Sequence, residues 1–280
     1  MASFRYVVAD VFTDEPLTGN QLAVFTDARE LPEELLQPLA REIGFSETVF
    51  VLTPEQGGHA RMRIFTPILE IPFAGHPTLG TAFVLGGPLQ LGLIVLETGS
   101  GPVPVELTRD ESGRIVFGRM AQPLPRVEPH PDPEGYLAAL GVERSELSIE
   151  VYDNGIKHAY VALASKDAVA ALAPDWNALA RFSPFNANCF AGSGSSWKTR
   201  MFTPDGGYED PATGSAAGPL AVHLARHGLI GYGDEIEIEQ GTELRRPSRL
   251  FARVEGSPER LERVEVGGSA VVVARGEFRL

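Results

Sequence analysis

Short apolar runs separated by turns that contain Gly and Pro dominate the chain, and most of them alternate or are rich in β-branched residues. Such runs predict β-strands. The strands predicted in this way cover residues 4–11, 21–25, 45–51, 60–65, 93–97, 103–107, 114–117, 149–152, 158–163, 198–202, 235–240, 249–254, 263–266 and 270–275.

Two kinds of helix interrupt the strands. Residues 31–43 place their leucines on one face, and Gly44 ends the segment as a C-terminal glycine does. Residues 76–85 are apolar nearly all round, which indicates a helix buried inside its domain. Similar runs predict a second apolar helix from the corner at 211–215 to His227 and shorter helices over 134–140 and 166–171.

The second half of the chain repeats the first. Both halves contain Arg-x-Phe-Thr-Pro followed by an acidic residue, a proline, a glycine and an apolar helical run. Order is preserved and spacing is nearly constant, so we interpret the repeat as an internal duplication. The matched stretches are 19–24 with 155–161, 63–85 with 200–224, and 97–99 with 239–241.

The centre of each repeat is a strand that stops at a Pro/Gly corner and then begins a helix. The first amides of a helix have no acceptor within it, and the positive end of the helix dipole lies there, so such a corner favours an anion. Two corners in one chain predict two half-sites that face each other across a cleft. Between the halves, residues 121–135 hold five prolines and no periodic apolar pattern, which predicts an irregular linker.

Composition narrows the classes of function. The formal charge of −13 over 280 residues argues against nucleic acid and against an anionic membrane surface. Cys189 is the single cysteine, so a disulfide framework or a cysteine-based metal cluster is not expected. No apolar run approaches the ~20 residues of a membrane-spanning helix, and the N-terminal residues lack a signal-peptide layout. We therefore expect a soluble, cytoplasmic protein that acts on a small anionic molecule.

Several motifs together give the chain a family resemblance. It resembles the phenazine-biosynthesis PhzF-like isomerases over essentially its whole length. The motifs that carry the resemblance are 10–13 (DVFT), 19–20 (GN), 46–50 (SETVF), 73–78 (FAGHPT), 209–216 (EDPATGSA), 239–241 (EQG) and 246–248 (RPS).

The resemblance implies an α+β fold of two pseudo-symmetric halves similar to diaminopimelate epimerase. Each half would be a curved, mostly antiparallel sheet or barrel around a central helix. The expected halves are residues 1–125, to which 266–280 return, and residues 126–265. A homodimer is also implied, and no cofactor. In the epimerase two cysteines at the corners exchange protons, whereas Ala74 and Thr213 stand at those positions here.

The resemblance also assigns site residues. Glu47 is the expected general acid and base, with a pKa raised by burial in a closed site. His76 and Asp210 are the other expected catalytic residues. Asn20 is expected to bind substrate, together with the corner residues Gly75, Thr213, Gly214 and Ser215, whose amides would hold a carboxylate or a developing enolate.

Plainer interpretations of these residues stay open at this point. Glu47 would also suit a solvated strand entrance, and His76 a packed histidine. Asp210 would also suit an N-terminal helix cap, and the glycines a tight turn. His158 fits the core better than the site. Function likewise stays open between a proton-shifting isomerase, an epimerase or racemase, and a non-catalytic small-molecule binder.

Other candidate motifs fail. Residues 192–199 resemble a phosphate-binding loop, but Trp197 replaces its last glycine and no helix follows. His223 and His227 have the spacing of a zinc pair, yet the glutamate of a His-Glu-x-x-His motif is absent. We therefore predict no metal site.

Overall fold

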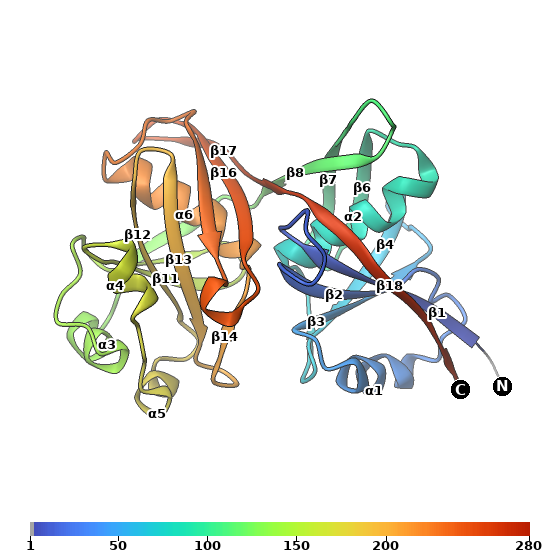
Figure 1. Ribbon diagram of the computed structural model, residues 1–280, viewed down its shortest axis with the longest axis horizontal. Helices are drawn as coiled ribbons and strands as arrows, with labels where there is room; N and C mark the ends of the chain where they lie inside the picture. The colour runs from blue at the N-terminus through green and yellow to red at the C-terminus, as the bar shows by residue number, and fades with distance from the viewer. Residues whose placement is uncertain (1–2) are drawn as a thin grey trace. The chain divides into compact units, whose positions relative to one another are not determined.

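The computed structural model describes residues 3–280, and the chain divides into two compact units. The first unit comprises Met1–Ala121 with Gly267–Leu280, and the second comprises Gln122–Val266. The C-terminal strand therefore belongs to the unit that contains the N-terminal strand, and Figure 1 shows these two strands running side by side. No helix of the described residues is long and apolar enough to cross a membrane.

The first unit is built on one mixed sheet. β1 pairs antiparallel with β18 and β2, β2 runs parallel to β3, and β3 is antiparallel to β4. β4 runs parallel to β6, which continues antiparallel to β7 and then β8, while the short β5 pairs with β4. The elements are β1 (Ser3–Val11), β2 (Asn20–Phe25), α1 (Glu33–Ile43), β3 (Glu47–Leu52), β4 (Ala60–Phe65), β5 (Glu70–Ile71), α2 (Gly75–Leu89), β6 (Leu93–Thr98), β7 (Gly101–Arg109), β8 (Ile115–Gln122) and β18 (Ala270–Arg279).

Helix α2 is the centre of this unit. It contacts β1, β2 and β3 as well as β6, β7 and β18, so strands from both ends of the sheet meet the same helix and the sheet curves around it. Every residue from Gly75 to Val84 is buried, which confirms the prediction from the all-round apolar pattern. The helix continues to Leu89, beyond the predicted end at residue 85.

The second unit repeats this plan. β10 is antiparallel to β11, β11 parallel to β12, β12 antiparallel to β13, β13 parallel to β15, and β15 antiparallel to β16. The elements are β9 (Arg126–Pro129), α3 (Pro133–Leu140), β10 (Glu150–Asp153), β11 (Lys157–Ala162), α4 (Lys166–Ala170), α5 (Trp176–Leu179), η1 (Ala180–Phe182), β12 (Asn186–Ser193), β13 (Ser196–Thr203), β14 (Tyr208–Asp210), α6 (Gly214–Arg226), β15 (Glu235–Gln240), η2 (Thr242–Leu244), β16 (Ser248–Gly256) and β17 (Leu261–Gly268).

Helix α6 takes the place of α2. It is buried from Gly214 to Ala225 and packs against β11 and β16. The order parallel, antiparallel, parallel through β2–β3–β4–β6 recurs in β11–β12–β13–β15, so the duplication inferred from the sequence is also a duplication of strand pairing. The predicted α+β class with a curved sheet around a helix is confirmed. The pairings among the described strands leave the sheet open, so it is not a closed barrel.

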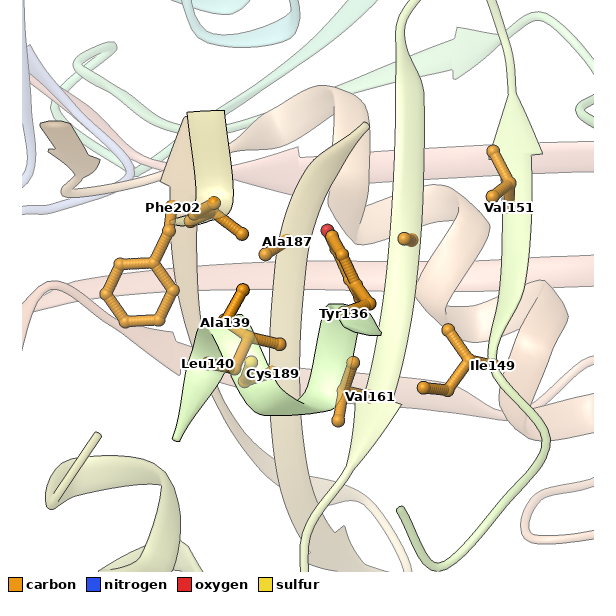
Figure 2. Packing of buried hydrophobic residues seen from close by; sticks show 11 residues of the cluster. Tyr136, Ala139, Leu140, Ile149, Val151, Val161, Ala187, Cys189 and Phe202 are labelled. Atoms are coloured by element: carbon orange, nitrogen blue, oxygen red, sulfur yellow. The ribbon is translucent and has the colours of Figure 1, made fainter. Parts of the chain in front are cut away.

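In the second unit, a cluster of buried apolar side chains packs α3 against the sheet. Figure 2 shows Tyr136 and Leu140 of α3 packed over Val161 of β11 and Cys189 of β12. Cys189 is fully buried there, and burial raises the pKa of its thiol to about 12. The thiol therefore stays protonated at neutral pH.

The prediction of an irregular linker over residues 121–135 was wrong. β9 occupies Arg126–Pro129 and pairs antiparallel with β10, and α3 begins at Pro133. The prolines lie where a backbone N–H is dispensable, since Pro129 ends a strand and Pro133 opens a helix behind the Asp132 cap, whose carboxylate accepts from Gly135 N at 2.9 Å. The pattern therefore missed β9, whereas the helix predicted over 134–140 is present and begins one residue earlier, at Pro133.

The closeness of packing around α6 gives a stability prediction. A Cβ at Gly218 would lie 2.3 Å from Gln122 Oε1 and 2.6 Å from Val264 Cγ1. Gly218→Ala should therefore lower the free energy of unfolding by about 1–3 kcal/mol through overpacking, although alanine is the better helix former. Gly87→Ala on α2, where a Cβ would meet nothing within 4 Å, should raise it by up to about 1 kcal/mol. Urea unfolding of both variants tests the contrast, and equal effects would contradict it.

Candidate active site

Three of the predicted residues, Asn20, Glu47 and His76, lie close together in the first unit. Glu47 is the first residue of β3, next to Leu22 of β2, and His76 lies in the first turn of α2. Glu47 Oε2 and His76 Nε2 are 3.4 Å apart, with side chains only 14% and 5% exposed. A carboxyl group and an imidazole are thus held together out of water.

Burial changes the chemistry of this carboxyl group. Removing the carboxylate from water disfavours its charged form and raises the pKa of Glu47 from 4.5 to about 7. A hydrogen bond from Ser46 acts in the opposite direction and is the smaller influence. Glu47 Oε2 makes no hydrogen bond with the described residues. The expectation of a buried glutamate with a raised pKa therefore agrees with the structure, and the solvated alternative does not.

Asn20 orients the histidine. Its Nδ2 lies 3.4 Å from His76 Nδ1, and Ser46 Oγ lies 3.2 Å from its Oδ1. An amide nitrogen only donates, so Nδ1 of His76 is the accepting nitrogen and Nε2 carries the hydrogen that faces Glu47. Asn20 is buried at the start of β2, where it orients the imidazole of His76. Its contact with a substrate stays a prediction.

The start of α2 supplies the first corner. Ala74 is the N-cap in an extended conformation and makes no side-chain cap bond, and Gly75 is the first helical residue. The Thr78 amide and hydroxyl both donate to the Ala74 carbonyl, at 3.3 and 2.8 Å. The amides of Gly75 and His76 precede this first bonded turn, where backbone donors and the helix dipole favour an anion.

The second unit holds the remaining predicted residues. Asp210 ends β14, and Thr213 Oγ1 donates to its Oδ2 at 2.6 Å. Gln240 fixes this corner because its Nε2 donates to the Asp210 carbonyl at 2.8 Å and to Thr213 Oγ1 at 2.9 Å. Ser248 Oγ donates to the Pro211 carbonyl at 2.9 Å. The corner is therefore tied to β15 and β16 by side chains.

Two expectations change here. Thr213 N donates to Gln240 Oε1 at 3.1 Å, so this amide is already engaged and the amides that α6 offers are those of Gly214 and Ser215. Thr213 is also the N-cap residue of α6, without a side-chain cap bond of its own. Asp210 therefore holds the N-cap residue and is not itself that residue.

A buried histidine supports Ser215. Asn188 Nδ2 lies 3.1 Å from His158 Nδ1, and His158 Nε2 lies 3.0 Å from Ser215 Oγ. Burial lowers the pKa of His158 to about 3, so the ring is neutral at neutral pH. With Asn188 as donor, Nε2–H of His158 donates to Ser215, which leaves the serine hydroxyl to donate elsewhere. His158 is fully buried, as the core interpretation expected.

Sequence reasoning missed the residues that support the site. Ser46 and Gln240 lie inside motifs that were recognised, but nothing in the pattern gave them a role. Asn188 was missed because β12 was not predicted. None of the predicted site residues belongs to the one group of described residues that could share a metal ion, which is Glu150, His223 and His227.

The pKa of Glu47 predicts a pH dependence of stability. Between about pH 4.5 and 7 the native state binds more protons than the unfolded chain, so the free energy of unfolding falls as pH rises through this window. The shift corresponds to at most about 3 kcal/mol. Glu47→Gln should remove this fall, whereas Glu42→Gln on the exposed face of α1 should keep it. Urea unfolding from pH 4 to 8 measures the difference, and parallel curves for wild type and Glu47→Gln would contradict the assignment.

The chain is similar to a known protein family over nearly its whole length. Residues 9–276 match the PhzC-PhzF family, described as phenazine biosynthesis-like protein. The chain is 52% identical over 277 residues to the trans-2,3-dihydro-3-hydroxyanthranilate isomerase of Pseudomonas aeruginosa, with 99% of each chain covered.

Solved structures with a similar fold include members of the same family. A phenazine biosynthesis protein of the PhzF family from Bacillus anthracis is similar over 100% of both chains, with a TM-score of 0.87 and 26% identity. A probable proline racemase from Agrobacterium radiobacter shares the fold, with a TM-score of 0.66 at 13% identity over 99% of this chain and 93% of the racemase. The chain belongs to the PhzC-PhzF family of phenazine biosynthesis-like proteins, has their epimerase-type fold, and is an isomerase of the PhzF type.

Proposed function

We propose that this isomerase moves a proton between two carbons of one small carboxylate-bearing substrate, with Glu47 as general acid and base and without a cofactor. The observation that carries the proposal is the buried carboxyl group of Glu47, 3.4 Å from His76 Nε2 and with a pKa of about 7. Near neutrality such a group is present in both protonation states, so it can take a proton and return it.

The reaction balances within the substrate. Glu47 accepts the proton as one C–H bond breaks, the electron pair shifts through the adjoining double bonds, and Glu47 returns the proton to another carbon. No electrons leave the molecule and no second reactant is needed. Asn20 holds His76 so that Nε2–H lies beside the carboxylate of Glu47. From this position His76 stabilises the negative charge that Glu47 carries before it accepts the proton.

The helix starts have the complementary role. In the proposal the amide of Gly75 in the first unit, and those of Gly214 and Ser215 in the second, are donors suited to a substrate carboxylate or to an oxygen on which enolate charge develops. Asp210, bound by the Thr213 hydroxyl, would accept a hydrogen bond from a polar group of the substrate. Fixed donors of this kind stabilise developing charge without reorganising during the reaction.

The name of a relative suggests the substrate. Because the chain is 52% identical to a trans-2,3-dihydro-3-hydroxyanthranilate isomerase over nearly all of both chains, we propose this compound, or one with the same carboxylate, amine and hydroxyl groups, as the substrate. An epimerase-type reaction is the second candidate, and the shared fold with a probable proline racemase supports it. The two corner thiols of such enzymes are replaced here by Ala74 and Thr213, which favours the first candidate. A homodimer stays part of the proposal.

Glu47→Gln tests the shuttle. The amide cannot take or return the proton, so the rate of isomerisation of trans-2,3-dihydro-3-hydroxyanthranilate should fall by about 10²–10⁴-fold. Deuterium exchange from D₂O into the substrate should fall with it. In the wild type the rate should rise as pH increases through about 7, because the first step needs the carboxylate form.

Glu42→Gln is the matched control and should leave rate, exchange and pH profile unchanged. Circular dichroism and thermal unfolding establish that both variants are folded. Undiminished exchange in folded Glu47→Gln would remove this residue from the mechanism. Loss of handedness in a chiral amino acid, without any shift of its double bonds, would instead favour the epimerase.

Ser215 and His158 form a second, separable test. Ser215→Ala removes one donor to the substrate and should raise KM about tenfold, the equivalent of one hydrogen bond. His158 positions that serine, so the single variant His158→Gln should raise KM. Added to Ser215→Ala, the same substitution should have little further effect on KM. A double-mutant cycle on KM and kcat measures the coupling. Fully additive effects would contradict the positioning role.

A further inference from the structure

Two histidines and a glutamate meet at the end of α6 opposite to Ser215. His223 and His227 are one turn apart on α6, and Glu150 faces them from β10. Glu150 Oε2 lies 3.3 Å from His223 Nδ1 and 3.2 Å from His227 Nε2, and the three ligand atoms lie within 4.8 Å of one another. Tyr152 adds its hydroxyl, 2.9 Å from the same carboxylate oxygen and 3.1 Å from His223 Nδ1.

These contacts have hydrogen-bond and ion-pair distances, and the same separations also suit metal ligands. Zinc binds nitrogen and oxygen at about 2.0–2.1 Å in tetrahedral sites, which places two neighbouring ligand atoms about 3.3 Å apart. The two measured separations to Glu150 Oε2 lie at that value. We propose that Glu150, His223 and His227 bind a divalent transition-metal cation of the zinc type, with the Tyr152 hydroxyl or a water at the fourth position.

The surrounding charges are compatible with a cation. The guanidinium of Arg226 lies 3.6 Å from Glu150 Oε1, the other oxygen of this carboxylate, and also interacts with the Tyr152 hydroxyl, so a water is the better fourth ligand. His227 is the C-cap residue of α6, where the helix dipole is negative and favours positive charge. One carboxylate and two imidazoles form a His₂Glu set of the kind that holds zinc in proteins.

Burial gives the site both rigidity and access. His223 is fully buried, and its ring is positioned by stacking on Tyr160 and by the contacts of its Nδ1 with Tyr152 and Glu150. His227 is 24% exposed and Glu150 18% exposed, which provides a way in for a hydrated cation. Because a helix rises 1.5 Å per residue, His223 lies about 12 Å along α6 from Ser215.

That distance separates the cation from Ser215 at the second corner and gives it a structural role. A bound metal would join β10 to the last turn of α6 within the second unit. It would therefore stabilise the native state and hold the helix whose first residues form the second corner. The site goes beyond the proposed function and stands or falls separately from it.

Metal titration of the full-length chain, first freed of metal with a chelator, tests the proposal. Zn²⁺ should bind with one equivalent per chain by calorimetry and raise the melting temperature in a saturable manner. Co²⁺ should give the strong visible absorption of a four-coordinate ion with nitrogen and oxygen ligands, and Zn²⁺ should displace it. These readouts do not depend on catalysis.

His227→Gln and Glu150→Gln are the informative variants, since both side chains are partly exposed and their replacements keep the shape. Each should weaken Zn²⁺ binding at least about tenfold, the scale on which altered metal sites lose affinity. His59→Gln, an exposed histidine of the first unit, is the control and should bind as the wild type does. Absence of stoichiometric uptake by the wild type, or uptake that survives both Glu150→Gln and His227→Gln, would overturn the site.

Discussion

The desolvation of one carboxyl group is the constraint on which the rest of the site depends. Glu47 lies beside His76 with only 14% of its side chain exposed, and the loss of water around it raises its pKa to about 7. A glutamate on the surface would stay ionised at neutral pH and could not return a proton readily. The fold creates this environment by starting β3 next to β2 and directing the first turn of α2 at the same point.

The duplicated architecture explains why two helix starts are available. Each unit wraps its sheet against one nearly apolar helix, so the helix N-terminus must emerge from the core at a corner set by neighbouring strands. In the first unit the corner carries His76, whose imidazole is oriented by Asn20. In the second it carries Ser215, supported by His158. The same strand–corner–helix plan thus presents an acid–base pair in one copy and hydrogen-bond donors in the other.

Most helices and strands could be predicted from periodicity, because buried helices and alternating strands leave regular patterns, whereas their arrangement was predicted from the family resemblance. The strand over 235–240 and the end of α1 at Gly44 were predicted at their observed positions. β12 was missed because Asn-Ala-Asn-Cys-Phe-Ala-Gly-Ser lacks both alternation and β-branched residues; tertiary packing makes it a strand. The motifs indicated Glu47 and His76, but only coordinates pair Asn188 with His158, or bring Glu150 to the two histidines of α6.

Titration of the Glu47 carboxyl group itself shows whether the fold desolvates it. Carbon-13 NMR of protein labelled at the glutamate carboxyl carbons follows each group with pH, and the resonance absent from Glu47→Gln belongs to Glu47. A desolvated Glu47 should give this resonance a midpoint near pH 7. A midpoint near 4.5, the ordinary value for a glutamate, would show that the carboxylate is solvated and would contradict its role as acid and base.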